Sequence, residues 1–217
     1  MVKNISIFCG AHEGTNPNYA LEAKKITALL SKKGVDVVFG GGNVGIMKII
    51  SDEAKDNNSK VTGITMESLH NLELTNPRID DLVVTHSLLE RKDEFMKRSD
   101  AFLVLPGGVG SLDELAEILA SNQLGIINKP VGLLNTDGYY DHLIAWFEKA
   151  VDEGFITQAN LDELIITDDC EEMVMRILEE KNESSKDWKG RLGLYPLSLE
   201  IRIPSSNNIH IGNAKKT

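Results

Sequence analysis

The sequence has few cysteines and no long hydrophobic run. Only two of its 217 residues are cysteines, Cys9 and Cys170, too few and too far apart to suggest a disulfide framework or a metal site. No segment approaches the about 20 apolar residues of a membrane span. The apolar run in "MVKNISIFCG" is also too short for a secretory signal. We therefore expect a cytoplasmic protein that has no metal and no membrane partner.

Basic residues are scarce relative to acidic ones. The chain has 23 Lys and Arg against 33 Asp and Glu, a formal net charge of −10. Nucleic acids and anionic membranes are bound by clusters of Lys and Arg, so this balance argues against both partners. Any phosphate compound that binds here should be small. The composition, 41% apolar and 26% charged, is that of an ordinary globular protein.

Short apolar runs alternate with helical patterns along most of the chain. Strands are predicted at 5–8, 35–39, 60–65, 81–85, 101–105, 131–134 and 163–167, and helices at 17–33, 44–57, 88–98, 112–124, 139–153 and 170–181. Such alternation predicts an α/β fold, a Rossmann-like doubly wound parallel sheet with helices on both faces.

The C-terminal segment breaks this pattern. Residues 1–182 are predicted to form a single Rossmann-like domain. Residues 183–217 show no helical period, and although "LSLEIRI" alternates like a strand, no partner strand is evident. We expect these residues to form a peripheral or disordered C-terminal extension, because so few can hardly bury a core of their own.

Three glycine-containing loops each follow a predicted strand: "CGAHEG" at 9–14, "GGGNVG" at 40–45 and "PGGVGS" at 106–111. In doubly wound sheets ligands bind beyond the carboxyl ends of the strands. The third loop also opens a helix, whose free N–H groups and partial positive charge favour an anion such as phosphate. Asp113 and Glu114, expected in the first turn of that helix, would repel phosphate, so a nearby cation is needed.

The loop "GGGNVG" matches the dinucleotide fingerprint G-x-G-x-x-G. Glu67 follows the next strand, roughly where an NAD enzyme places its ribose-binding acid. The match is weak, because the fingerprint follows the second strand and not the first. An NAD-dependent oxidoreductase therefore stays an alternative, beside glycines that only permit a tight turn.

The segment "PGGVGSLDE" resembles the P-G-G-x-G-T-x-x-E motif of the Lonely Guy (LOG) family, the cytokinin riboside 5′-monophosphate phosphoribohydrolases, long labelled possible lysine decarboxylases. Other segments resemble the family in the same order: "FCGAHEG", "GGGNVGIM", "ERKDEF", "SDAFLVLPGG", "QLGIINKPVGLLNTDGYYDHL" and "EGFI". The resemblance covers residues 3–181. It implies hydrolysis of a nucleoside 5′-monophosphate to free base and ribose 5-phosphate, with no cofactor, in a homodimer.

The resemblance also implies the roles of individual residues. Arg91 and Glu114 match the catalytic pair, and the expected substrate-binding residues are Gly42, Asn43, Phe95, Arg98, Gly107, Gly108, Val109, Gly110 and Ser111. On the residues alone, Ser111-x-x-Glu114 is also a capping box. The helix at 88–98 can equally be a solvated basic face, and Lys92 is expected at the surface.

The sequence departs from the family pattern where the base is expected. Phe95 replaces a methionine, Ser121 a tryptophan and Ile127 a histidine. Ser111 replaces a threonine at the expected phosphate contact and keeps its hydroxyl. The preferred base, an N6-modified or a plain adenine, therefore stays open. A nucleotide-binding or sensing module without turnover is the main alternative. Cys9 is expected to be a bystander, and "DGYYDHL" at 137–143 to have a structural role.

Overall fold

The computed structural model describes residues 1–70 and 75–179. Its seven strands form one parallel sheet in the order β4-β3-β2-β1-β5-β6-β7. They are β1 (Asn4–Phe8), β2 (Asp36–Phe39), β3 (Val61–Met66), β4 (Asp81–Thr85), β5 (Ala101–Val104), β6 (Val131–Leu134) and β7 (Leu164–Thr167). All seven predicted strands and the predicted fold class are confirmed. The predicted extension at 183–217 lies outside the described residues.

The helices follow the strands in the expected alternation. They are α1 (Asn18–Lys32), α2 (Gly45–Asp56), α3 (Glu67–His70), α4 (Leu88–Arg98), α5 (Val109–Gln123), α6 (Asp141–Asp152), α7 (Gln158–Asp162) and α8 (Cys170–Glu179), with the 3-10 turn η1 (Thr136–Gly138). The short α3, α7 and η1 were not predicted, because a helix of one turn is too short to show a 3.6-residue period.

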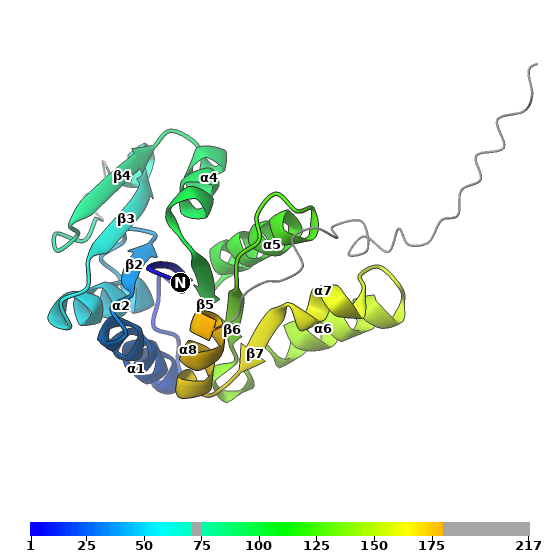
Figure 1. Ribbon diagram of the computed structural model, residues 1–217. Helices are drawn as coiled ribbons and strands as arrows, with labels where there is room; N and C mark the ends of the chain where they lie inside the picture. Colours follow the sequence, from blue (N-terminus) through cyan, green and yellow to red (C-terminus); the bar gives the residue numbers. More distant parts are fainter. Residues whose placement is uncertain (71–74, 180–217) are drawn as a thin grey trace, which may run out of the picture.

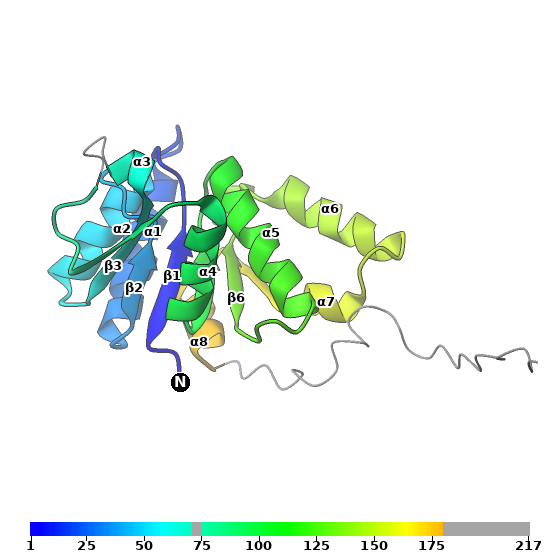
Figure 2. The ribbon, with the colours of Figure 1, turned by 90° about the horizontal axis from the view of Figure 1, so that it is seen from above.

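Helices cover both faces of the sheet, and each layer has its own apolar core (Figures 1 and 2). On one face α1, α2 and α8 bury residues such as Ile26, Ile50 and Met173 against the strands. On the other face α4, α5 and α6 pack around Phe95 and Phe102. The central strands β1 and β5 are buried on both faces, and β5 reads as a continuous apolar run. The buried polar side chain of β1, Ser6, lies 2.6 Å from the hydroxyl of Ser99.

The sheet changes its winding direction between β1 and β5. From β1 the chain moves outward to β2, β3 and β4, then returns to β5 on the other side and continues to β6 and β7. The loops after β1 and β5 therefore diverge and leave a crevice at the carboxyl edge, which is where ligands bind in such sheets. The backbone N–H of Gly10 donates to the carbonyl of Pro106 at 3.1 Å and joins the bases of the two loops.

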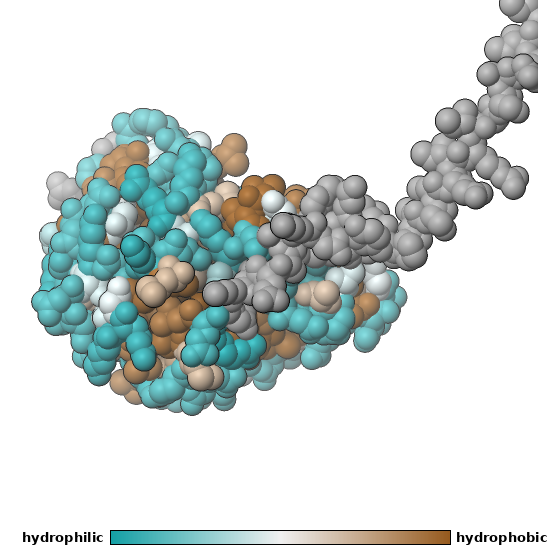
Figure 3. All heavy atoms as spheres, viewed as in Figure 1, coloured by the Kyte–Doolittle hydropathy of each residue, from teal (hydrophilic) through white to brown (hydrophobic). Residues whose placement is uncertain are grey.

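Hydropathy is uneven on the face that Figure 3 shows. Hydrophilic atoms cover much of the side around α2, and apolar atoms gather near the middle of the described part and beside α5. Within the described residues no helix has the length and apolar character that a membrane span requires.

Candidate active site

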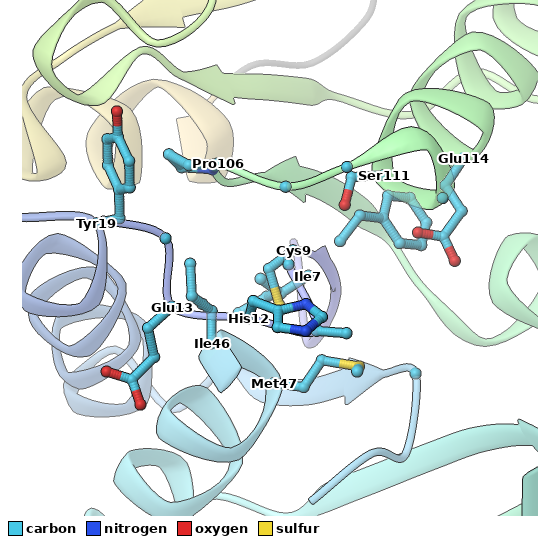
Figure 4. Close-up of a pocket in the computed structure, with 18 of the residues that line it drawn as sticks. Ile7, Cys9, His12, Glu13, Tyr19, Ile46, Met47, Pro106, Ser111 and Glu114 are labelled. Atoms are coloured by element: carbon cyan, nitrogen blue, oxygen red, sulfur yellow. The ribbon is translucent and has the colours of Figure 1, made fainter. Parts of the chain in front are cut away.

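A cavity of about 470 Å³ opens at the switch point between β1 and β5. Its volume falls in the range of small-molecule sites. Its walls are formed by the loop after β1, the loop after β5, the first turns of α2 and α5, and one side chain of α4, Arg91. In Figure 4 Ser111 and Glu114 stand on one side of this cavity and Tyr19 on the other, with Cys9 and His12 between them.

Arg91 and Glu114 meet at the wall of the cavity. Arg91 Nη1 donates to Glu114 Oε1 at 2.9 Å, although the first residue lies on α4 and the second on α5. Their side chains are only 16% and 11% exposed. The ion pair is therefore poorly screened by solvent, and it leaves the second carboxylate oxygen of Glu114 free of this bond.

The guanidinium of Arg91 is fixed by three further features of the fold. Its Nε donates to the carbonyl of Ile64 at 3.0 Å, and its central carbon lies 4.9 Å from the centre of the Phe95 ring. A Cβ on Gly40 would stand 2.8 Å from Arg91 Nη2. Glycine at position 40 thus gives the guanidinium the room to lie flat beside β2.

The environment of Glu114 raises the pKa of its carboxyl group. Burial is the largest cause, because a charged carboxylate loses hydration there, and Arg91 offsets part of this effect by favouring the charged form. Burial and the nearby Glu114 also raise the pKa of the Cys9 thiol. A protonated thiol is a poor nucleophile, which agrees with the prediction that Cys9 is a bystander.

Helix α5 begins earlier than the sequence predicted, and this corrects two interpretations. The helix starts at Val109 with Gly108 as its N-cap, so Ser111 lies inside the helix and the capping box is wrong. Asp113 and Glu114 therefore follow the first turn, which contains no acidic residue. Gly108 has no side chain to cap the helix, so the leading N–H groups are left for an anion.

Ser111 supports the loop that precedes it. Its side chain is 3% exposed, and a Cβ on Gly107 would overlap with its Oγ atom. The same Cβ would lie 3.0 Å from the backbone nitrogen of Gly10. Gly107 is required for this close approach, and the glycine-rich loop is packed between β1 and α5.

Lys92 joins α4 to α5, contrary to the expectation of a plain surface residue. Its Nζ atom lies 2.9 Å from Glu117 and 3.3 Å from Asp113, and its side chain is 18% exposed. Because Lys92 neighbours Arg91 in sequence, the two residues form parallel ion pairs to α5. These pairs tie α4 to α5 on the solvent side of the Arg91–Glu114 contact.

The loop at 40–45 packs against the backbone of the loop after β1. Gly45 has φ +51°, and a Cβ there would overlap with the backbone of Ala11 and His12. The backbone N–H of Ile46 donates to the carbonyl of Gly10 at 3.1 Å, so this N–H is not free to bind a pyrophosphate. Glu67, the expected ribose acid of an NAD site, lies 3.1 Å from His86. None of these contacts favours the NAD alternative.

The structure brings six of the predicted site residues to the cavity wall: Arg91, Glu114, Gly107, Gly108, Gly110 and Ser111. Five others do not line it. Phe95 is 1% exposed in the core, Val109 is 84% exposed, and Arg98 pairs with Glu94 at 2.8 Å. The remaining two are Gly42 and Asn43. Among the described residues, no group of three or more Cys, His, Asp or Glu side chains is placed to hold a metal ion.

Sequence reasoning did not assign several residues of the wall. They are His12, Glu13, Tyr19, Met47 and Tyr139. His12 and Glu13 belong to the loop after β1, so their place at a strand end was the available signal. Tyr19 and Tyr139 come from elements that only the tertiary packing brings to the cavity.

The chain matches the family model described as "Possible lysine decarboxylase" over residues 47–177. It is 39% identical over 178 residues to the probable cytokinin riboside 5′-monophosphate phosphoribohydrolase LOG4 of Oryza sativa subsp. japonica, covering 82% of this chain and 77% of that protein. It is 36% identical over 190 residues to the cytokinin riboside 5′-monophosphate phosphoribohydrolase LOG2 of Arabidopsis thaliana, covering 88% and 89%.

Solved structures share the fold at lower identity. A molybdenum cofactor binding protein from Rippkaea orientalis superimposes with a TM-score of 0.63 at 24% identity, covering 82% of this chain and 96% of that one. The molybdenum cofactor carrier protein of Chlamydomonas reinhardtii gives the same TM-score at 18% identity, covering 83% and 100%. At these identities the likeness shows the fold alone.

Proposed function

The chain belongs to the LOG family of cytokinin riboside 5′-monophosphate phosphoribohydrolases, and we propose that it is such a hydrolase, which splits a nucleoside 5′-monophosphate into free base and ribose 5-phosphate. The observation that carries this function is the buried Arg91–Glu114 pair beside the glycine-rich start of α5. A carboxylate for the sugar and an anion site for the phosphate lie on one cavity wall.

Glu114 is the group that acts at the sugar. In the reaction, the bond between C1′ and the base nitrogen breaks, the oxygen of water bonds to C1′, and the base leaves with a proton. The sugar passes through an oxocarbenium-like state, whose positive charge a nearby carboxylate stabilises. The same carboxylate can orient the water and accept its proton. Arg91 favours the ionised form of Glu114 and holds its carboxylate in place.

The start of α5 is the group that binds the 5′-phosphate. Gly107, Gly108 and Gly110 line the cavity without side chains, so the phosphate can approach the backbone closely. The helix dipole adds partial positive charge at this end, and the first turn contains no acid to oppose it. The guanidinium of Arg91 adds a cation at this wall and offsets the charge of Glu114.

Two other activities fit the site less well. A binding or sensing module has no need of a carboxylate buried at the sugar. Lysine decarboxylation by pyridoxal phosphate requires a lysine that forms a Schiff base, and the described residues that line the cavity include no lysine.

The narrower parts of the proposal are AMP as a substrate, a homodimer and a cytoplasmic location. The proposal of AMP rests on the proposed sites for the phosphate and the sugar, neither of which depends on an N6 substituent. Support for a dimer comes from apolar side chains exposed on α4 and α5, namely Leu88, Leu89, Val109 and Leu112. The location remains a prediction from the sequence.

Base release decides between the enzyme and the binding module. The protein is incubated with AMP, with isopentenyladenosine monophosphate and with adenosine, and the free base is quantified by chromatography. We expect base from the monophosphates and far less from adenosine, because adenosine lacks the anion. Equal turnover of AMP and adenosine would contradict the phosphate site, and binding of AMP without base release would favour the sensing module.

A further inference from the structure

The segment "DGYYDHL" reaches the active site through one hydroxyl group. Tyr139 lines the cavity, and its hydroxyl donates to the carbonyl of Gly107 at 2.5 Å. Gly107 follows β5, whereas Tyr139 follows the turn after β6, so this bond joins two separate loops. The proposed catalytic pair and phosphate site do not use the tyrosine.

The hydroxyl of Tyr139 orients one peptide unit of the phosphate loop. A peptide is planar and trans, so the direction of the Gly107 carbonyl also fixes the direction of the Gly108 N–H. Gly108 is the N-cap of α5 and lines the cavity. Because glycine restricts its own backbone least, a peptide between two glycines needs an outside contact to hold one orientation.

The turn η1, which directly precedes Tyr139, is fixed by side-chain hydrogen bonds. Asp137 adopts φ +51° and accepts hydrogen bonds from Asn16 and Asn18 at 2.7 and 2.8 Å. The ring of Tyr139 packs edge-on against Tyr19, with centroids 5.3 Å apart. The left-handed backbone at a non-glycine residue is unfavourable, and the two asparagine contacts offset this cost. The turn therefore presents the tyrosine to the loop in a fixed position.

We propose that Tyr139 is a positioning residue of the 5′-phosphate site, whose hydroxyl holds the Gly107–Gly108 peptide so that the Gly108 N–H is directed at the phosphate. This inference rests on the proposed function of the same cavity. It predicts that the hydroxyl acts on binding of the phosphate group and leaves the chemistry at the sugar unchanged.

Tyr139→Phe tests this role by deleting a single oxygen. We expect the KM for AMP to rise about three- to tenfold with kcat nearly unchanged, since a less well oriented Gly108 N–H weakens the hold on the phosphate equally in the ground and transition states. Competitive inhibition by ribose 5-phosphate should weaken by the same factor. Inhibition by adenosine, which has no phosphate, should be unchanged.

Tyr140→Phe is the matched control in the neighbouring position. The Tyr140 hydroxyl donates to the carbonyl of Leu105 at 2.8 Å, and the residue is 7% exposed. Tyr140 also contacts the backbone of Gly107. Tyr140→Phe therefore loses hydroxyl contacts to the same loop, but it leaves in place the bond from Tyr139 to the Gly107 carbonyl, and with it the orientation of the Gly107–Gly108 peptide. We expect a lower melting temperature and unchanged constants for AMP and ribose 5-phosphate.

The outcomes separate this inference from the proposed function. Should the wild type bind ribose 5-phosphate in calorimetry without hydrolysing AMP, the function fails, yet a three- to tenfold weaker Kd in Tyr139→Phe alone still supports the tyrosine's role. An unchanged Kd and KM in Tyr139→Phe, or an equal loss of adenosine inhibition, overturns the role. A wild type that neither binds ribose 5-phosphate nor releases base from AMP overturns both.

Discussion

Arg91 and Glu114 are 23 positions apart in sequence and lie on different helices, yet Arg91 Nη1 and Glu114 Oε1 are 2.9 Å apart. Both side chains are largely buried, so each neutralises a charge that would otherwise stand alone in a poorly solvated place. This contact fixes one carboxylate oxygen and leaves the other to act at the cavity.

Glu114→Gln should abolish most of the activity and leave the fold intact. Loss of one preorganised charge at the reacting sugar lowers kcat by a factor on the order of 10² or more. The free energy of unfolding should fall by about 1–3 kcal/mol, because glutamine keeps the volume and an oxygen acceptor for Arg91 but leaves the buried guanidinium without a charged partner. Base-release kinetics and thermal melts measure the two effects.

Glu117→Gln is the control for that variant. Glu117 lies on the same helix but pairs with Lys92 outside the cavity. It should keep the wild-type kcat. Near wild-type kcat in Glu114→Gln would remove Glu114 from the reaction and favour the binding module.

Arg91→Lys should lose activity while it folds normally. A lysine cannot reproduce the planar guanidinium, which donates both to Glu114 and to the carbonyl of Ile64. We expect kcat/KM for AMP to fall by about 10². Steady-state kinetics at one fixed ionic strength measures this loss.

Arg98→Lys provides the comparison on the same helix. Arg98 was predicted to bind substrate, but it contacts Glu94 and Asp81 and does not line the cavity. The structure therefore predicts unchanged kinetics for Arg98→Lys. A loss as large as that of Arg91→Lys would restore the prediction made from the sequence.

The pH dependence of kcat should reflect the raised pKa of Glu114. The reaction needs the carboxylate, so activity is present above that pKa and is lost as the pH falls through it. The acidic limb of the profile should accordingly lie above the ordinary glutamate value of about 4.3. In Arg91→Lys the cation is held less well beside Glu114, so the pKa of Glu114 should rise further. The acidic limb of that variant should therefore lie at higher pH.

A pH–rate profile of kcat from mildly acidic to neutral pH checks this expectation. Glu117→Gln should leave the limb where it is in the wild type. A limb at or below the ordinary glutamate value would mean that Glu114 is not the group whose protonation stops the reaction.

Two adjacent glycines should respond differently to alanine. Gly107→Ala places a Cβ against Ser111 Oγ, and overpacking of this kind costs about 1–3 kcal/mol in the free energy of unfolding. Gly108→Ala meets no atom within 4 Å and should fold normally. Its new methyl group lies beside the cavity, so the KM for AMP should rise. Thermal melts and kinetics on both variants measure these effects, and a stable Gly107→Ala would contradict the close packing of the loop.

Much of the fold followed from local sequence patterns. All seven strands were predicted because each is a short apolar run bounded by turn residues, and long helices such as α1 and α4 show a clear period. The start of α5 was placed too late, since glycines were read as outside the helix although Gly110 lies within it. The single-domain prediction for residues 1–182 stays a prediction.

The sequence by itself determined the alternation of strands and helices, the glycine loops at strand ends and, through the family resemblance, the pair Arg91 and Glu114. These features are local, because periodicity and motif spacing depend only on residues that are close together in the sequence. Only the tertiary structure decided that Phe95 and Arg98 lie away from the cavity, that Lys92 joins α4 to α5, and that Tyr139 contacts Gly107. The physical reason is that contacts between distant elements depend on how the two helical layers pack against the sheet, which no local pattern records.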